Sequence, residues 1–261
     1  MACRNQERAQ NAKNRILARM PNADLALMSL DLGRLAAVRA FAGKVRKTYS
    51  HLDLLINNAA IYRVPYSKTE DGFESQLGIN YLGHFSLTLL LLDRMPDTPE
   101  SRVVTVCSVG HKTGKIHFDD LQSEKTYLAL GAYCQSKLAC LIFADELHKR
   151  LEAKGRQVLS VAAHPGFSQT EMNRHMSKIR NAIMKYTLLP LITHPPKEAV
   201  KPILLAALGA DVKGGEYYGP QGFLEMRGKP GKASKAKQAQ DEQVAKKLWQ
   251  VSEELTGTSY A

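Results

Sequence analysis

Hydrophobic and polar positions follow two alternating patterns along the chain. Short apolar runs are separated by longer segments in which apolar residues recur at every third or fourth position. The short runs predict strands and the longer segments predict amphipathic helices. Strands that alternate with helices are typical of an α/β fold with a doubly wound parallel sheet. The expected strands are 24–32, 52–57, 102–107, 158–163 and 216–218, and the expected helices are 6–19, 34–48, 70–94, 130–153, 197–209 and 238–255.

The regular alternation lapses over residues 167–195, which mix Met and Leu with basic side chains. We expect this stretch to be a lid over an apolar substrate. The alternative is a peripheral membrane contact through residues 172–194, because Lys178, Arg180 and Lys185 accompany the apolar side chains there.

A second irregular stretch, residues 227–237, is rich in Gly, Lys and Pro and is expected to be a loop that leads to the last helix. It lacks interleaved aromatic residues, so no nucleic-acid partner is expected. The predicted organisation is one domain over residues 1–226, followed by a basic C-terminal loop and helix over residues 227–261. The pattern leaves the oligomeric state open.

Charge adds a preference for anionic partners. The 261 residues include 36 Lys and Arg against 25 Asp and Glu, a formal net charge of +11. Such a charge suits a polyanion, a membrane surface or an anionic cofactor and does not choose among them. No apolar run approaches the roughly 18 residues of a membrane span, and the polar N-terminus does not resemble a secretory signal.

The cysteines and histidines indicate neither a disulfide framework nor a metal site. The four cysteines form no Cys-x-x-Cys pair. His84, His111, His117 and His164 have no partner at metal-ligand spacing, so each is interpreted as structural. We therefore expect a soluble, cytoplasmic protein without a bound metal.

Tyr133 and Lys137 are the first candidates for chemistry. They are four residues apart in the expected helix 130–153, so both side chains emerge on one face. A nearby ammonium favours the ionised phenol and lowers its pKa from about 10, which makes Tyr133 a usable general acid or base. On this spacing alone, a solvated surface pair is the simpler interpretation.

Polar residues at the ends of the expected strands change that interpretation. Ser108 follows strand 102–107, Asn57 and Asn58 end strand 52–57, and residues 164–170 follow strand 158–163. The carboxyl ends of parallel strands meet at the edge of the sheet where open α/β proteins bind ligands. The sequence therefore predicts that these side chains converge near Tyr133.

Six motifs carry a resemblance to a known family. The order and spacing of these motifs over residues 2–225 resemble those of the short-chain dehydrogenase/reductase family, in the branch of retinol dehydrogenases and protochlorophyllide reductases. The resemblance implies a Rossmann-like fold and NADP(H)-dependent hydride transfer on an apolar alcohol, aldehyde or ketone. The motifs are N-N-A-A at 57–60, I-N-Y-L-G-H-F at 79–85, V-C-S ending at Ser108, F-D-D-L at 118–121, Y-C-Q-S-K at 133–137 and H-P-G-x-x-x-T at 164–170.

The resemblance also implies roles for individual residues. Tyr133 would exchange a proton with the substrate oxygen and Ser108 would hydrogen-bond that oxygen. Lys137 would lower the pKa of Tyr133 and hold the nicotinamide ribose, while Asn80 would position a water molecule. Beside Tyr133 and Lys137, which are implied to contact the cofactor as well, the implied cofactor contacts are Asp31 and Leu32 at the adenine, Asn58 and Ala59 along the groove, and Ser168 and Thr170 at the nicotinamide end.

Arg4 is the candidate for cofactor choice. In the family, an acid just past the second strand binds the ribose of NAD, whereas an Arg accommodates the 2′-phosphate of NADP. Residues 2–5 contain Arg4 and no acid. NADP(H) is therefore the expected cofactor, and a solvated Arg at a helix start is the alternative.

One family motif has no counterpart. The family opens with a strand followed by T-G-x-x-x-G-x-G, whose backbone amides hold the pyrophosphate, whereas the first glycine of this sequence is Gly33. We therefore expect a Rossmann-like fold that is incomplete at the N-terminus. Two explanations stay open: a start codon assigned too far downstream, which we favour, or a truncated and catalytically inactive family member.

Overall fold

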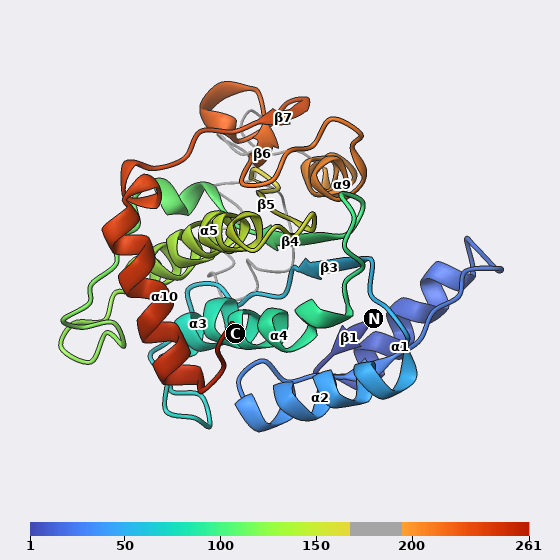
Figure 1. Ribbon diagram of the computed structural model, residues 1–261, viewed down its shortest axis with the longest axis horizontal. Coiled ribbons are helices and arrows are strands. Elements are labelled where there is room, and N and C mark those ends of the chain that lie inside the picture. The colour runs from blue at the N-terminus through green and yellow to red at the C-terminus, as the bar shows by residue number, and fades with distance from the viewer. Residues whose placement is uncertain (168–194, 261) are drawn as a thin grey trace, which may run out of the picture.

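A computed structural model of the chain describes residues 1–167 and 195–260 (Figure 1). A five-stranded sheet runs in the order β3-β4-β5-β6-β7. Its first four strands are parallel, so their carboxyl ends share one edge, and β7 is antiparallel to β6. The α/β prediction with a parallel sheet is confirmed. The strands are β3 (Leu54–Asn57), β4 (Arg102–Val106), β5 (Leu159–Ala163), β6 (Tyr217–Pro220) and β7 (Pro230–Lys232).

The N-terminal strands form a separate parallel pair. β1 (Ala2–Cys3) pairs with β2 (Met28–Ser29), and α1 (Gln6–Leu17) connects them. The prediction of a strand over residues 24–32 is largely wrong, because β1 offers only two residues for pairing. In the described residues no strand pairing joins β1 to β3, and Ile56 of β3 is 41% exposed.

Helices cover both faces of the five-stranded sheet (Figure 1). One face carries α4, α5 and α10, whose core includes Phe85, Phe143 and Trp249. The other face carries α9, which packs on β4, β5 and β6. No described helix has both the length and the apolar character that a membrane crossing requires. The helices of these layers and their neighbours are α2 (Leu35–Thr48), α4 (Gly83–Leu91), α5 (Ala129–Ala153), α8 (Pro196–Ala199), α9 (Lys201–Leu208) and α10 (Glu242–Thr256).

The expected helix over residues 70–94 begins later and is interrupted. The Glu74 side chain caps α3 (Ser75–Leu77) by accepting hydrogen bonds from the backbone amides of Gln76 and Leu77, each at 2.8 Å. A π-helical turn, Gly78–Leu82, then precedes α4. Such wide turns occur frequently at functional sites, and this one contains Asn80.

The C-terminal region differs from the prediction in three places. The expected loop over residues 227–237 contains β7, which pairs with β6. The expected helix over residues 197–209 is divided into α8 and α9 near Pro202, which has no amide proton to donate. Finally, α10 begins at Glu242 because the Asp241 side chain caps it. The predicted domain boundary between residues 226 and 227 stays a prediction. The predicted lid over 167–195 lies almost wholly outside the described residues.

Gly83 allows α4 to approach the segment that follows β2 closely. A Cβ atom added to Gly83 would lie 2.4 Å from the Leu32 carbonyl oxygen. We expect Gly83→Ala to lower the free energy of unfolding by about 1–3 kcal/mol, because a packed backbone must shift. Urea unfolding followed by the fluorescence of Trp249, the only tryptophan, measures this change. Gly43→Ala in α2 is the matched control, because its added Cβ meets nothing within 4 Å and should not destabilise the protein. Equal losses in the two variants would contradict the packing argument.

Candidate active site

Ser108 and Tyr133 meet at the carboxyl edge of the sheet, as the sequence predicts. Ser108 lies two residues after the end of β4 and caps a short 3-10 turn, Val109–Lys112, where its Oγ accepts a hydrogen bond from the Gly110 amide at 3.2 Å. A Cβ atom added to Gly110 would lie 3.5 Å from both Ser108 Oγ and Tyr133 Cε1. The two side chains therefore face each other across a glycine that leaves room for them.

Lys137 lies one turn beyond Tyr133 on α5, inside the protein. Tyr133 is 7% exposed and Lys137 is 3% exposed, so the alternative of a solvated surface pair is wrong. The Lys137 Nζ donates a hydrogen bond to the Val106 carbonyl at the end of β4, at 2.8 Å. The ammonium group of Lys137, held at the end of β4, can stabilise negative charge that develops at the site.

Burial controls the ionisation of Tyr133. Burial raises the pKa of the Tyr133 phenol above its ordinary value, although the Lys137 charge and a hydrogen bond with Ser108 lower it. The expected direction of the Lys137 effect is therefore correct, and the expected net fall of the pKa is wrong. As a result Tyr133 is protonated at neutral pH and can donate its proton.

Asn80 connects the segment after β3 to α5. Its Oδ1 accepts from the Ile61 amide at 2.8 Å, and its Nδ2 donates to the Ile61 carbonyl and to Ser136 Oγ, each at 3.0 Å. The Asn80 carbonyl accepts from His84 Nδ1 at 3.0 Å and from Cys140 Sγ at 3.1 Å. The side chain is thus engaged in fixing the site, and its role toward a water molecule stays a prediction.

Tyr62 is a site residue that the sequence analysis missed. Its ring packs edge to face against the ring of Tyr133, with centroids 4.6 Å apart. It follows the N-N-A-A motif by two residues, and this proximity to a motif is the only signal in the sequence. Tyr62 gives the site an aromatic wall on the side of β3.

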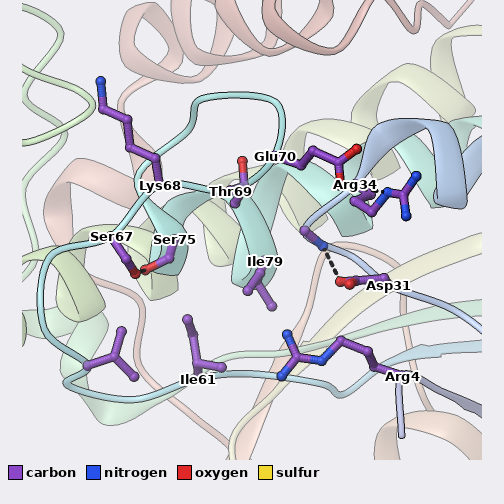
Figure 2. A pocket seen from close by; sticks show the side chains of 12 residues that line it. Arg4, Asp31, Arg34, Ile61, Ser67, Lys68, Thr69, Glu70, Ser75 and Ile79 are labelled. Carbon is purple, nitrogen blue, oxygen red and sulfur yellow. Dashed lines mark hydrogen bonds and ion pairs between the residues drawn. The ribbon is translucent and has the colours of Figure 1, made fainter. Parts of the chain in front are cut away.

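A cavity of about 410 Å³ lies beside the ends of β1, β2 and β3 (Figure 2). Arg4 and Asp31 both line it, as expected for residues that follow β1 and β2. The Asp31 Oδ1 accepts from the Gly33 amide at 2.9 Å. Two other cations of the cavity are paired, Arg34 with Glu70 at 2.9 Å and Lys68 with Glu124 at 2.6 Å.

The exposed Arg4 makes no ion pair with any other residue in 1–167 or 195–260. Its guanidinium is therefore available to an anionic group in this cavity, and that availability fits the 2′-phosphate of NADP.

The other predicted cofactor contacts lie outside this cavity. Leu32 packs in the core beneath α2 and α4. Asn58 and Ala59 are exposed directly after β3, where they border the edge that carries Ser108. Ser168 and Thr170 lie outside the described residues.

The chain is similar to several known proteins. A family model described as short chain dehydrogenase matches residues 1–181. Retinol dehydrogenase 13 of Mus musculus is 39% identical over 267 residues, which cover 100% of this chain and 77% of that protein. Retinol dehydrogenase 11 of Homo sapiens is 38% identical over 259 residues, which cover 98% of this chain and 78% of that protein.

A solved structure is similar as well. The crystal structure of an uncharacterised protein from Mycobacterium paratuberculosis superposes with a TM-score of 0.79 at 37% sequence identity. The superposition covers 100% of this chain and 84% of that one. A protein of known crystal structure therefore has a similar arrangement of helices and strands.

Proposed function

Because the chain belongs to the short chain dehydrogenase family, in its retinol-dehydrogenase-like branch, we propose that it interconverts an apolar alcohol with its aldehyde or ketone. The proposed cofactor is NADP(H), and the proposed catalytic residues are Tyr133, Ser108, Lys137 and Asn80. The observation that carries the proposal is the cluster of the partly buried Ser108 with the buried Tyr133 and Lys137 at the carboxyl edge of the sheet.

Residues of the Arg4 cavity and of the sheet edge near Ser108 would hold the two ends of an NADP cofactor. Arg4 would hold the 2′-phosphate, with Asp31 beside it in the same cavity. Asn58 and Ala59 would border the groove, and Lys137 would hold the nicotinamide ribose. Ser168 and Thr170 are proposed contacts at the nicotinamide end. When it is bound, the cofactor supplies the hydride in reduction and accepts it in oxidation.

Ser108 and Tyr133 would hold the oxygen of the substrate between them. In reduction, the Ser108 hydroxyl orients the carbonyl oxygen and Tyr133 donates its proton to that oxygen as the new C–H bond forms. The raised pKa of Tyr133 keeps the proton in place at neutral pH. Lys137 then stabilises the phenolate that remains, and proton transfer to Tyr133 restores the site.

Apolar side chains around Tyr133 support an apolar substrate. Tyr62 packs against the ring of Tyr133, and Leu130 lies one turn before it on α5 with 48% of its surface exposed. Leu128, at the start of the same helix, is 70% exposed. The relatives are named for retinol, which is itself an apolar alcohol.

An assay of NADPH oxidation with a series of straight-chain aldehydes tests the proposed function. We expect turnover, with kcat/KM rising as the aldehyde chain lengthens, because each buried methylene contributes about 0.8 kcal/mol to binding. Equal kcat/KM for short polar and long apolar aldehydes would contradict the substrate class. No turnover with any carbonyl compound would contradict the proposed reaction.

Arg4 provides a test of the cofactor. We expect Arg4→Gln to raise the KM for NADPH by about 10- to 100-fold, since a charged hydrogen bond contributes about 1.5–3 kcal/mol, and to leave the KM for NADH nearly unchanged. Steady-state kinetics with both cofactors measure the two values. Arg19→Gln, at an exposed position beyond α1, is the matched control and should change neither KM. A wild-type protein that uses NADH as well as NADPH would contradict the assignment.

A further inference from the structure

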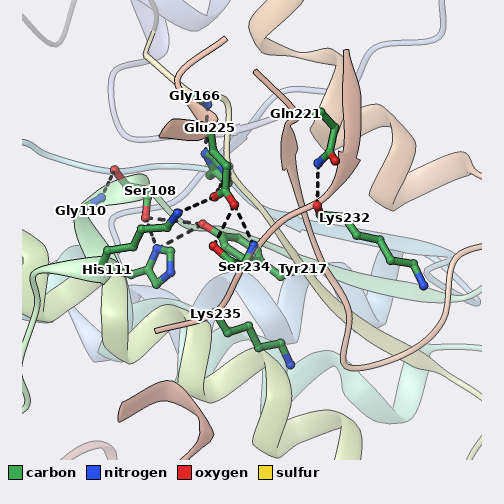
Figure 3. Close-up of polar contacts among 12 residues, drawn as sticks. Ser108, Gly110, His111, Gly166, Tyr217, Gln221, Glu225, Lys232, Ser234 and Lys235 are labelled. Carbon is green, nitrogen blue, oxygen red and sulfur yellow. Dashed lines mark hydrogen bonds and ion pairs between the residues drawn. The ribbon is translucent and has the colours of Figure 1, made fainter. Parts of the chain in front are cut away.

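A buried histidine, His111, makes hydrogen bonds to the main-chain carbonyl of Ser108. The His111 Nδ1 lies 2.7 Å from the Ser108 carbonyl oxygen, and the His111 backbone amide donates to the same oxygen at 3.1 Å (Figure 3). A carbonyl oxygen only accepts, so the Nδ1 carries a proton and donates it. His111 therefore fixes the peptide that carries the Ser108 hydroxyl.

The His111 ring is itself enclosed. It is 0% exposed, and it packs at right angles against the ring of Tyr217 with centroids 5.1 Å apart. Burial lowers the pKa of His111, although the carbonyl groups of Ser108 and Ser234 act in the opposite direction. The Tyr217 hydroxyl also lies 3.5 Å from the Ser108 carbonyl oxygen.

Glu225, in the connection between β6 and β7, clamps the turn that contains His111. Its Oε2 lies 2.9 Å from the Nζ of Lys112, the residue next to His111, and 3.6 Å from His164 Nε2. Its Oε1 accepts from the Ser234 amide at 2.9 Å and from Ser234 Oγ at 2.8 Å (Figure 3). Burial raises the pKa of Glu225, but its polar contacts with His164, Ser234 and Lys112 outweigh burial and hold the pKa below its ordinary value.

The backbone at Glu225 is strained. Leu224 and Glu225 have φ values of 50° and 56°, in the left-handed region that residues other than glycine rarely adopt. Such a conformation costs about 1–3 kcal/mol and persists only where surrounding contacts impose it. The bonds that Glu225 makes to Lys112 and Ser234 are contacts of this kind.

We propose that His111 is a positioning residue for Ser108 and that Glu225 holds His111 in place, so that the connection between β6 and β7 sets the position of the Ser108 hydroxyl. The inference rests on the proposed function, because it assigns this cluster to the same reaction. His111 touches neither substrate nor cofactor, and it acts through the Ser108 carbonyl. Glu225 acts one step further away, through Lys112.

Two substitutions of His111 separate positioning from packing. His111→Asn keeps a side-chain N–H near the place of Nδ1 but loses volume, whereas His111→Leu keeps the volume and loses the donor. We expect His111→Leu to lower kcat by about 10- to 100-fold with little change in the KM for NADPH, since small displacements of a reacting group have effects of this size. We expect His111→Asn to retain most of kcat although it is the less stable variant.

The matched control is His148→Leu, the same substitution at a half-buried histidine. His148 lies near the C-terminal end of α5, whereas Tyr133 lies near its N-terminal end, so this variant should leave kcat unchanged. If kcat follows stability, with His111→Asn the slower enzyme, His111 only fills space and the positioning role is wrong.

A double-mutant cycle tests the part of Glu225. We expect Glu225→Gln to lower kcat about 3- to 10-fold in the wild-type background and to have almost no further effect in the His111→Leu background, because residues that act through one another are not additive. Additive losses in kcat would mean that Glu225 acts independently of His111 and would overturn this step.

Amide hydrogen exchange provides a readout that does not depend on turnover. The Gly110 amide donates to Ser108 Oγ, so its exchange rate reports on the position of the Ser108 hydroxyl. We expect faster exchange over residues 108–113 in His111→Leu and Glu225→Gln, and wild-type exchange in His111→Asn and His148→Leu. Unchanged exchange in all four variants would overturn the inference, whereas an inactive wild-type protein with the expected exchange pattern would count against the proposed function alone.

Discussion

Tyr133→Phe is expected to lower kcat for carbonyl reduction by about 10²- to 10⁴-fold, which is the usual contribution of a general acid. The substitution removes the donated proton and keeps the ring that packs against Tyr62. The KM for NADPH should change little, because Arg4 and its cavity lie at the other end of the proposed cofactor site. Steady-state NADPH oxidation with a long-chain aldehyde measures both constants.

A second buried tyrosine serves as the control for this experiment. Tyr81 is 2% exposed, and its hydroxyl lies 2.7 Å from Ser252 Oγ of α10, away from Ser108. Tyr81→Phe should lower stability by about 1 kcal/mol, the value of one hydrogen bond, and leave kcat within about two-fold of wild type. A Tyr133→Phe enzyme that is as active as Tyr81→Phe would remove Tyr133 from the mechanism.

Lys137→Met is expected to separate activity from stability. The substitution keeps the length of the side chain and removes a buried charge, so the free energy of unfolding should change by no more than about 2 kcal/mol. We expect kcat to fall by about 10²-fold, because the phenolate of Tyr133 loses the cation that stabilises it. Urea unfolding and steady-state kinetics on the same preparation measure the two effects.

The pH profile gives the sign of the Lys137 effect. Lys137 lowers the pKa of Tyr133, so its removal raises that pKa further. In alcohol oxidation Tyr133 must accept a proton, and the rising limb of the kcat profile should therefore move to higher pH in Lys137→Met. If the rising limb of the kcat profile lies at the same pH in Lys137→Met and in the wild type, Lys137 does not affect the ionisation of Tyr133.

The central part of the fold could be predicted from the sequence. The apolar runs at β3, β4 and β5 are short, those at β4 and β5 are buried, and the motifs that follow the three strands identified the family, which is confirmed. Strand β7 could not be predicted, because Pro-Gly-Lys has no strand pattern and pairs only where β6 offers an edge. The late start of the helix after β3 depends on the cap that Glu74 makes, and apolar periodicity does not contain that information.

The candidate site, like the fold, could be predicted from the sequence only in part. Tyr133, Ser108, Lys137 and Asn80 lie in motifs, and the structure brings them to one edge of the sheet. The net direction of the Tyr133 pKa was wrong because it depends on burial, which no local spacing contains. The contact of Glu225 with Lys112 joins segments more than a hundred residues apart, so no sequence pattern indicated it.

Transfer of deuterium from the nicotinamide carbon tests the central claim most directly. NADPH that carries deuterium at C4 would be incubated with the protein and a long-chain aldehyde, and the alcohol would be analysed by mass spectrometry. We predict one deuterium at the carbinol carbon of the product and none when Tyr133→Phe replaces the wild type over the same period. An alcohol that carries no deuterium, whichever face of C4 is labelled, would contradict hydride transfer at this site. The absence of any alcohol would contradict it as well.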